Sequence, residues 1–420
     1  MIKLKFKTRE KKDKKMLERL YNEMAENSLD WIILSGIRTN CPDIMYIAKG
    51  FTFAEPIIAI KRDGKPVFIH EMMESEEALQ SQEQTICRDD IISRSSLISL
   101  PAGQRTGAFW NALIKKLGIS GKVLFTGSEA TGKAFMIYEE IKNHPEIEIA
   151  PFAASSILKT VREIKTEKEI SFIRRTSKKI IRIFSETEKF ISSCTEKDGF
   201  LYDSFANPAY LGSIRDIAKR IYSEEGLSKK EIPIISMGSD AASPHMRGND
   251  SMRLETGKTI VMDISPADEE TGYYSDMTRT FCINEASDRI RTLFRDVKDA
   301  YVKSSSLIKT GERLSIPDEA VCGLFEERGH KTPRTHPGTS EGYVHSLGHG
   351  VGLEVHEFPQ LSSRNTQKTF KNETVFTIEP GLYYKSIEAG IRLEDTFYLD
   401  KHGKLINLTE YPMELIIKTK

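Results

Sequence analysis

The chain has 420 residues, of which 39% are hydrophobic and 29% are charged, a balance that excludes disordered and fibrous classes. Its 61 basic and 61 acidic residues cancel, so no basic excess points to a nucleic-acid partner. At roughly 100–200 residues per domain, the length predicts two or three domains.

The sequence also carries information on membrane spans, a signal peptide and disulfide or zinc patterns. No apolar run reaches the roughly 18–20 residues that a membrane span requires, and the first residues lack the apolar core of a signal peptide. The five cysteines are scattered, without the paired spacing of a disulfide framework or a zinc ribbon. These features predict a cytoplasmic protein without a membrane partner.

The N-terminal part alternates helix and strand signals. Apolar residues at helical spacing predict a helix over Met16–Asn27, and the run Trp31–Gly36 predicts a short buried strand. Further elements are predicted as two strands around an Asp-Gly turn, one strand and one short helix, over Pro56–His70, Lys122–Gly127 and Phe135–Asn143. We interpret this part as a small α/β unit ending near Pro151.

The remainder begins with a long amphipathic helix predicted over Thr166–Ser192, followed by a second helix over Ser213–Glu225. Beyond Ile232, strand-like segments dominate, and two helices interrupt them near Asp288–Lys309 and Ile316–Arg328. The strand-like segments are TIVMDIS, YYSDMTRTFCI, TVFTIEP and GIRLEDTFYL. This order favours an α+β fold over a doubly wound sheet.

Two aspartates lie in segments that should be buried. Asp263 lies in the apolar strand TIVMDIS, and Asp276 lies in GYYSDMTRT, on what is predicted to be the next strand. A buried carboxylate is costly unless it is paired or bound to a cation. Each aspartate alone is also compatible with a turn or a helix N-cap.

The histidines are clustered. Five of the nine lie between His330 and His356, and the segment HSLGHGVGLEVHE holds His345, His349 and His356. Glycines flank His349, and glycine permits the close backbone approach that a metal or substrate pocket requires. The cluster therefore favours a functional site over isolated structural histidines.

Two glutamates complete the candidate set. Glu379 lies in TVFTIEPGLYY and Glu394 lies in GIRLEDTFYL, where each alone could be a carboxylate paired with a nearby arginine. With the two aspartates and His349 they supply four carboxylates and one imidazole, which suits Mn²⁺, Fe²⁺, Co²⁺ or Zn²⁺. Two such ions roughly 3.5–4 Å apart can activate a shared water molecule and polarise a carbonyl. The set predicts metal-assisted hydrolysis of an acyl bond.

The motifs GHGVGLEVHE, TIEPGLY and GIRLEDT, in this order after SDMTRT, resemble those of the pita-bread metallopeptidases of family M24. That family includes methionine aminopeptidase, aminopeptidase P and prolidase, with creatinase as a metal-free relative. The resemblance covers nearly the whole chain. It implies a pita-bread catalytic domain over residues 164–420, preceded by a smaller creatinase-type α/β domain over residues 1–155, and it implies a homodimer.

The resemblance also implies roles for the candidate ligands. Asp263 would bind one metal ion, and His349 with Glu379 would bind the other. Asp276 and Glu394 would bridge the two ions. Glu379 would serve in addition as the general acid/base.

Four further residues are implied near the substrate. His356 would donate to the scissile carbonyl, and His245 corresponds to a substrate-side histidine of the family. His345 and Arg392 would contact the substrate or support the ligands. For His345 the alternative is a structural hydrogen bond, and for Arg392 it is an ion pair that holds a ligand carboxylate.

The function implied is an exopeptidase that hydrolyses Xaa-Pro bonds with two divalent metal ions (Mn, Co, Zn or Fe), of the prolidase or the aminopeptidase P type. Three departures from the family pattern bear on it. Ser265 replaces a usual glycine, and the thirteen-residue spacing from Asp263 to Asp276 lengthens the loop of residues 266–272. Gln360 stands where many prolidases have an arginine, which weakens a strict dipeptidase assignment. The alternative function is that of a metal-free binding module or a creatinase-like hydrolase.

Overall fold

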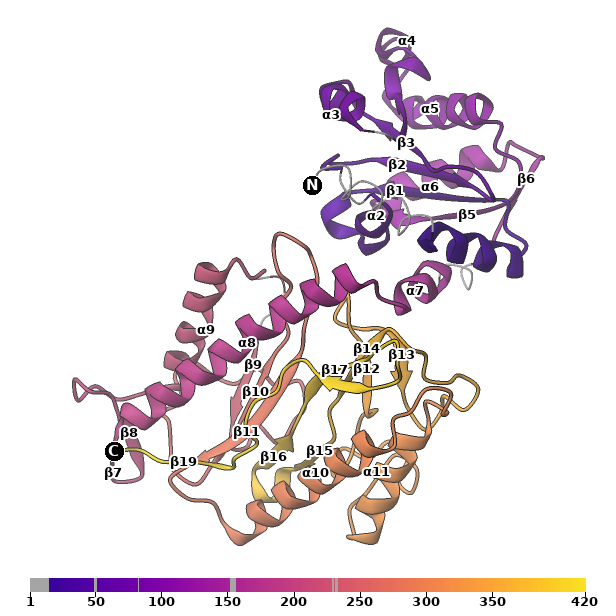
Figure 1. The fold of residues 1–420 in the computed structure, drawn as a ribbon. Coiled ribbons are helices and arrows are strands. Elements are labelled where there is room, and N and C mark those ends of the chain that lie inside the picture. Colours follow the sequence, from indigo (N-terminus) through magenta and orange to yellow (C-terminus); the bar gives the residue numbers. More distant parts are fainter. Residues whose placement is uncertain (1–14, 49–50, 82, 152–155, 229, 231–232) are drawn as a thin grey trace, which may run out of the picture. The chain divides into compact units, whose positions relative to one another are not determined.

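The computed structural model describes residues 15–48, 51–81, 83–151, 156–228, 230 and 233–420. The chain divides into two compact units, Met1–Arg162 and Glu163–Lys420, which we call the N-terminal and the C-terminal unit (Figure 1). Each unit has its own sheets and its own apolar core. None of the helices in the described ranges combines the length and the apolar character needed to cross a membrane.

The N-terminal unit is built on a six-stranded sheet with the order β4-β3-β2-β1-β5-β6. Its central strand β1 pairs antiparallel with β2 and parallel with β5, and all six residues of β1 are buried. Burial on both faces explains why this strand appears in the sequence as an uninterrupted apolar run. The strands are β1 Trp31–Gly36, β2 Ile57–Lys61, β3 Val67–His70, β4 Gln84–Cys87, β5 Gly121–Ser128 and β6 Ile147–Ile149.

Helices accompany this sheet, and residues 15–26 are helical as well. The longest, α5, buries Phe109, Trp110, Leu113 and Ile114 in the same core as β1. Sequence analysis did not predict α5, which contains two glycines that weaken the helical signal. The helices are α2 Pro42–Ile47, α3 Ser75–Gln80, α4 Arg94–Ile98, α5 Ala102–Leu117, α6 Thr131–Ile141 and α7 Ser156–Glu163, with 3₁₀ turns at Arg38–Asn40, Met72–Glu74 and Arg88–Asp90.

The C-terminal unit consists of two helix–sheet layers. In the first, helices α8 and α9 share one apolar core with the sheet β19-β11-β10-β9. The members of this layer are α8 Glu167–Ser193, α9 Leu211–Glu225, β9 Ile234–Met237, β10 Thr259–Ile264, β11 Met277–Ile283 and β19 Ile416–Ile417, and the small hairpin β7 Thr195–Lys197 with β8 Phe200–Tyr202 follows α8. Figure 1 shows α8 and α9 on the opposite side of the strands from α10 and α11.

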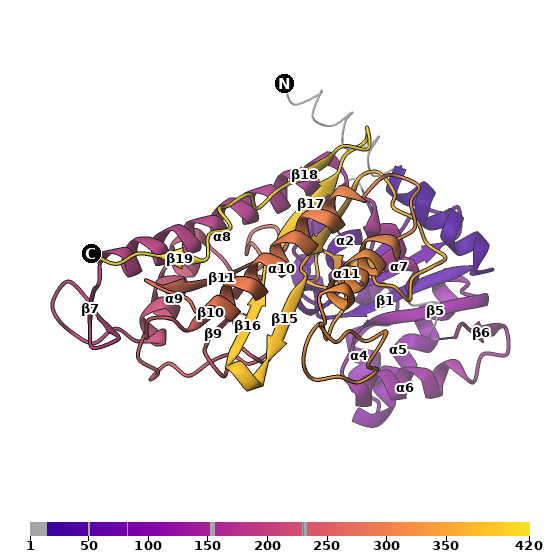
Figure 2. The same ribbon diagram turned by 90° about the horizontal axis from the view of Figure 1, so that it is seen from below.

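In the second layer, α10 and α11 share a core with the sheet β13-β12-β14-β17-β18 and with the hairpin β15-β16. Figure 2 shows α10 lying along β15 and β16. The elements are α10 Asp288–Ser306, α11 Ile316–Glu327, β12 Gly348–Gly350, β13 Glu357–Leu361, β14 Thr374–Ile378, β15 Gly381–Tyr384, β16 Ala389–Arg392, β17 Asp395–Leu399 and β18 Leu405–Asn407, with a 3₁₀ turn at Lys385–Ile387.

A backbone bridge between Thr278 and Glu394 joins the two layers. The amide of Thr278 on β11 donates to the carbonyl of Glu394 at 3.3 Å, and the amide of Glu394 donates to the carbonyl of Thr278 at 3.0 Å. Glu394 lies in the short gap between β16 and β17. This bridge therefore brings the acidic segments of both layers to the same place.

The α+β fold class predicted from the sequence is confirmed, with two differences in the predicted strands. The segment YYSDMTRTFCI becomes a strand only from Met277, because the amide of Tyr274 instead donates to the carbonyl of Gly352 at 2.7 Å. The segment GIRLEDTFYL forms two strands that are interrupted at Glu394, where the chain crosses from the β15-β16 hairpin to the larger sheet. Asp276 and Glu394 thus lie at strand ends rather than within strands.

Candidate metal centre

The five predicted ligands come from five separate strand segments of the C-terminal unit. The carboxylates of the first layer lie on β10 and just before β11, and the remaining ligands lie in the middle of β12, just after β14, and between β16 and β17. In chain order they are Asp263, Asp276, His349, Glu379 and Glu394. Residues that are up to 131 positions apart in the sequence therefore depend on the two-layer fold to meet.

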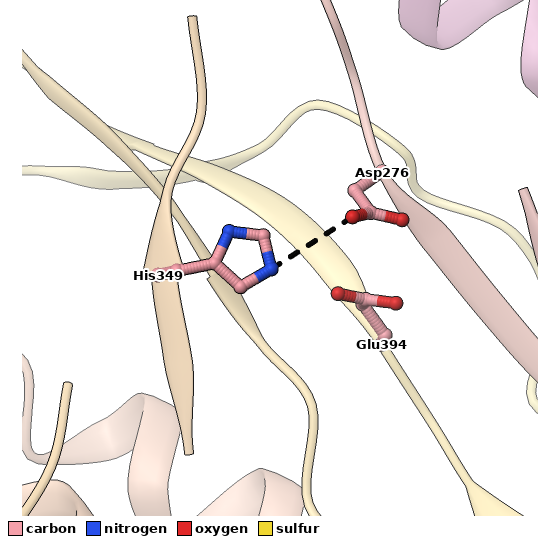
Figure 3. Close-up of side chains that lie close together, drawn as sticks. All are labelled: Asp276, His349 and Glu394. Atoms are coloured by element: carbon pink, nitrogen blue, oxygen red, sulfur yellow. Dashed lines mark ion pairs between the residues drawn. The ribbon is translucent and has the colours of Figure 1, made fainter. Parts of the chain in front are cut away.

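Three of these side chains point toward one another in Figure 3. Asp276, His349 and Glu394 each offer one ligand atom, and these atoms all lie within 4.8 Å of one another. His349 Nε2 lies 3.8 Å from Asp276 Oδ2 and 3.3 Å from Glu379 Oε1. The imidazole therefore faces carboxylates from both layers of the fold.

Backbone contacts fix the orientation of His349. Its Nδ1 lies 3.1 Å from the carbonyl of Gly350, which can only accept, so Nδ1 carries the proton and Nε2 keeps its lone pair. A Cβ at Gly348 would lie 2.1 Å from the Thr377 carbonyl, and one at Gly350 would lie 2.0 Å from the Phe358 carbonyl. The flanking glycines thus allow neighbouring backbone to approach β12 closely.

The carboxylates carry more negative charge than their surroundings balance. Burial, followed by the carboxylate of Glu394, raises the pKa of Asp276 well above its ordinary value. Burial and the carboxylate of Glu379 likewise raise the pKa of Glu394. Burial raises the pKa of Glu379 to about 8, against the lowering effect of Arg392. Without an added cation, protons take the place of the missing positive charge.

The pKa of the His349 imidazole is shifted in the opposite direction. Burial lowers its pKa to about 3, and His356, whose ring centroid lies 4.2 Å away, acts in the same direction. The ring is therefore neutral at physiological pH, which is the state in which histidine binds a metal ion.

Arg392 holds Asp263 within a chain of hydrogen bonds. Its Nη2 lies 2.5 Å from Asp263 Oδ2, and its Nη1 donates to the hydroxyl of Tyr383 at 2.7 Å. The same hydroxyl lies 3.1 Å from Nε2 of His345, whose Nδ1 lies 2.8 Å from the carbonyl of Ser346. Burial, with Arg392 as the next cause, lowers the pKa of His345 to about 4. This chain orients a carboxylate next to the site.

The remaining predicted residues line a cavity of about 1250 Å³ in the C-terminal unit. His245 and His356 are exposed along its wall, and Asp263, Asp276, His349 and Glu379 line the same cavity. Gln360 and Ser265, the two departures from the family pattern, also lie on this wall. The fold thus brings every predicted site residue except Glu394 to one cavity, and Glu394 adjoins it through Asp276 and His349.

The lengthened loop of residues 266–272 is anchored to α8. Asp268 is buried, and its two oxygens lie 2.7 Å from Arg175 Nη2 and 2.7 Å from Lys179 Nζ. Burial notwithstanding, the hydrogen bonds from Lys179 and Arg175 lower the pKa of Asp268. The lengthened loop therefore has a buried attachment point.

The donor set fits a divalent metal ion. Among the described residues, Asp276 Oδ1 is a buried oxygen without a hydrogen-bond partner, beside two further buried ligands, His349 and Glu394. Such an orphaned oxygen is rare unless a cation or water satisfies it. An oxygen-rich set with one imidazole is the donor type that Mn²⁺, Fe²⁺, Co²⁺ and Zn²⁺ accept.

Sequence analysis missed three supporting side chains. Tyr383 joins Arg392 to His345, Thr278 Oγ1 donates to Glu394 Oε2 at 2.6 Å, and Thr377 Oγ1 accepts from the amide of His349 at 3.1 Å. Each lies in an apolar strand segment that already carries a predicted ligand. A hydroxyl within such a run must find a partner when buried, and this was the available signal.

Comparison with known proteins adds independent evidence. Residues 210–401, which include all five candidate ligands, match metallopeptidase family M24. An Xaa-Pro dipeptidase of Pyrococcus horikoshii is 26% identical over 403 residues, which cover 95% of this chain and 98% of that protein. The solved structure of an Xaa-Pro dipeptidase from Bacillus anthracis has a TM-score of 0.74 at 24% identity, covering 96% of this chain and 99% of that one.

The fold alone does not specify an activity. The N-terminal domain of FACT complex subunit SPT16 from Cicer arietinum has a TM-score of 0.72 at 14% identity, covering 97% of this chain and 99% of that one. The matched family segment and the carboxylate–histidine cluster within it therefore carry the assignment. Residues 210–401 form a domain of metallopeptidase family M24, the pita-bread metallopeptidases, and the protein is a metallopeptidase.

Proposed function

We propose that the protein is an exopeptidase that hydrolyses Xaa-Pro bonds with two divalent metal ions, and that Xaa-Pro dipeptides are its favoured substrates. The observation that carries the proposal is the convergence of buried carboxylates and a neutral imidazole around the orphaned oxygen of Asp276. Proline specificity is supported by relatives named Xaa-Pro dipeptidase, among them that of Pyrococcus furiosus, which is 28% identical over 286 residues.

In this proposal Asp263 would hold one metal ion, His349 and Glu379 would hold the other, and Asp276 and Glu394 would contribute to both. Four carboxylates balance the charge of two divalent cations, which is why so many acids can remain ionised together. When bound, the ions act as Lewis acids that activate water and polarise the scissile carbonyl.

Glu379 acts as the general acid/base in this proposal. Its buried carboxyl has a raised pKa, and its Oε1 lies 3.3 Å from His349 Nε2, next to the reacting centre. A carboxylate of this kind accepts a proton from the attacking water and returns it to the leaving amine. Thr377, whose hydroxyl lies 3.4 Å from Glu379 Oε1, helps to orient it.

The cavity histidines act on the substrate. His356, beside His349, donates a hydrogen bond to the scissile carbonyl as negative charge develops on its oxygen, and His245, which lines the same cavity, contacts the substrate. Arg392 is assigned to holding Asp263, since its guanidinium already contacts Asp263, Tyr383 and Thr278. His345 supports Arg392 through Tyr383.

Recognition of a dipeptide requires a partner for its free carboxylate. Gln360 cannot supply a positive charge, but Arg364 and Lys368 are exposed and line the same cavity. The favoured dipeptide substrate therefore calls for one of these two cations in the role that an arginine at position 360 would otherwise take.

The experiment is hydrolysis of Ala-Pro and Ala-Pro-Ala-Ala with added Mn²⁺ or Co²⁺, with a chelator as the control. Chelator-sensitive cleavage of Ala-Pro is the expected result. Cleavage of the longer peptide alone would replace the dipeptidase by an aminopeptidase P type. Failure to cleave either peptide by metal-loaded protein would remove proline specificity from the proposal.

The homodimer, the metal ions expected from the sequence (Mn, Co, Zn or Fe) and the cytoplasmic location stay predictions. Sedimentation of the purified protein measures the first, and metal analysis after purification without added metal measures the second. Fractionation of cells that produce the chain measures the third.

A further inference from the structure

The loop of residues 351–356, between β12 and β13, sets the position of His356. Its backbone is tied to both layers, since the amide of Val351 donates to the carbonyl of Val375 at 3.2 Å and the carbonyl of Gly352 accepts from the amide of Tyr274 at 2.7 Å. The imidazoles of His349 and His356 lie with their centroids 4.2 Å apart. A shift of this loop would therefore change how His356 faces the metal centre.

The buried carboxylate of Glu357 organises the loop from beneath. Its Oε1 accepts from the amide of Leu353 at 2.8 Å and from the amide of Glu354 at 3.2 Å. The Glu357 side chain is 1% exposed. Because amides in a buried loop must find acceptors, this one carboxylate fixes the turn that precedes His356.

Lys165 supplies the positive charge that this carboxylate needs. Its Nζ lies 2.8 Å from Glu357 Oε2, and its side chain is 2% exposed. Its own amide donates to the carbonyl of Glu373 at 2.7 Å, next to the bridge between Ile164 and Thr374. Lys165 is thus fixed to the start of β14, the strand that Glu379 directly follows.

An uncompensated carboxylate in this place would take up a proton or move toward water. Either change weakens the charge-assisted bonds to the amides of Leu353 and Glu354. The loss would be felt at His356, which follows these two residues by three and two positions. His349 adjoins the same loop, and the hydroxyl of Thr377 and the carbonyl of Gly350 hold it from outside the loop.

We propose that Lys165 is a positioning residue for peptide hydrolysis, which acts through Glu357 to hold the loop that carries His356. The inference rests on the proposed function of His356 as the donor to the scissile carbonyl. It assigns a role in turnover to a residue that lies outside the cavity wall.

The first test is the variant Lys165→Met, which removes the charge and keeps most of the side-chain volume. We expect kcat to fall on the order of 10²-fold, because a displacement of about 1 Å at a catalytic group has that effect. We expect KM and the bound metal per chain to change little. A loss of metal in proportion to the loss of activity would overturn the proposal.

A double-mutant cycle with His356→Ala separates positioning from general stabilisation. If Lys165 acts through His356, K165M causes no further loss of kcat in the H356A background, whereas independent effects would multiply. Multiplying losses would overturn the proposal. The variant K165M/E357Q, which buries no unpaired charge and keeps an acceptor oxygen at position 357, should regain about tenfold in kcat over K165M.

Arg328→Met is the matched control. Arg328 Nη1 lies 2.7 Å from Asp296 Oδ1 in the same unit, and neither residue lies on the cavity wall. R328M removes an ion pair without touching the loop, so its kcat should match the wild type. A fall in kcat as large as that of K165M would show that any lost ion pair in this unit has the same effect, and the proposal would fail.

Hydrogen exchange tests whether Lys165 holds the loop of residues 351–356, and it does not depend on a measurement of activity. Amides in residues 351–356 should exchange faster in K165M than in the wild type, and R328M should leave them unchanged. Unchanged exchange in K165M would overturn the proposal that Lys165 holds this loop, even if kcat falls. If the wild-type protein hydrolyses neither test peptide, the proposed function fails on its own, and the exchange measurement still decides whether Lys165 holds the loop. Should K165M fail to fold, K165M/E357Q against E357Q gives the same comparison.

Discussion

Glu394 and Asp395 are neighbours in the sequence and are both buried, yet their carboxylates have opposite surroundings. Asp395 is fully bonded within the chain: its oxygens accept from Arg279, Tyr301, Asn407 and Thr409. Glu394 accepts from the hydroxyl of Thr278 and otherwise faces other carboxylates of the metal centre, which raise its pKa together with burial.

The difference separates a structural carboxylate from a metal ligand. The charge of Asp395 is balanced by the guanidinium of Arg279, whose Nη2 lies 2.8 Å from it, so the protein completes this site by itself. Around Glu394 four carboxylates share one nearby arginine, Arg392. A buried excess of negative charge requires cations from outside the chain.

The largest expected effect concerns Glu394 and Asp276, whose negative charges the chain itself does not balance. Glu394→Gln, or equally Asp276→Asn, removes a bridging charge, and we expect hydrolysis to fall on the order of 10³-fold or more, because the ions supply several kcal/mol of stabilisation to the transition state. Metal content and rates of Ala-Pro hydrolysis measure this. The fold, followed by circular dichroism, should stay intact, since the removed charges repel each other in the metal-free protein. Near-normal turnover in either variant would contradict a dinuclear centre.

The next effect concerns Asp395, whose charge Arg279 balances within the chain. Asp395→Asn leaves the buried guanidinium of Arg279 without its counter-charge, and we expect stability to fall by about 3–5 kcal/mol. Chemical denaturation measures the loss. Metal content and turnover per bound metal should remain close to those of the wild type, in contrast to E394Q. If D395N loses metal and keeps its stability, the two carboxylates are not distinguished in the way described.

This pair also shows what could be predicted from the sequence. The motif GIRLEDT predicted Glu394 as a ligand, through its resemblance to a family, and the α+β class and the long helix α8 followed from spacing and patterning. Alternation alone could not decide which of two adjacent acids faces the metal centre. That choice depends on the strand break at Glu394, which the pairing of Glu394 with Thr278 imposes.

Contacts between distant segments escaped prediction for the same reason. Tyr383 and Thr278 support the site through hydroxyl groups, and no local pattern sets them apart from other buried polar residues. Helix α5 was missed because its two glycines are unfavourable in a helix, whereas packing on β1 stabilises it. Tertiary context decided each of these cases.

A smaller effect sharpens the comparison for the neighbouring imidazoles of His349 and His356, whose rings are tilted by 57° to each other. His349 is buried among carboxylates, whereas His356 is exposed on the cavity wall. We expect His356→Ala to lower kcat on the order of 10²-fold, as loss of one donor to a developing oxyanion does, while the metal content stays near that of the wild type. The exposed His336, which does not line the cavity, provides a control variant with unchanged kcat. Loss of metal in H356A with constant turnover per bound metal would assign His356 to metal binding instead.

The smallest effect is a pH dependence of the stabilisation that the metal gives. Glu379 has a pKa of about 8 in the folded, metal-free chain and an ordinary value of 4.5, so its protonated form favours folding. That stability is complete below the ordinary value and is lost as pH rises through about 8, and Asp276 and Glu394 shift in the same direction. Metal ions replace these protons, so adding Mn²⁺ to chelator-treated protein should raise Tm more at pH 8 than at pH 5, by several degrees. E379Q should reduce this difference. An equal rise in Tm at both pH values would mean that the carboxylates of the metal centre are already neutralised without the ions.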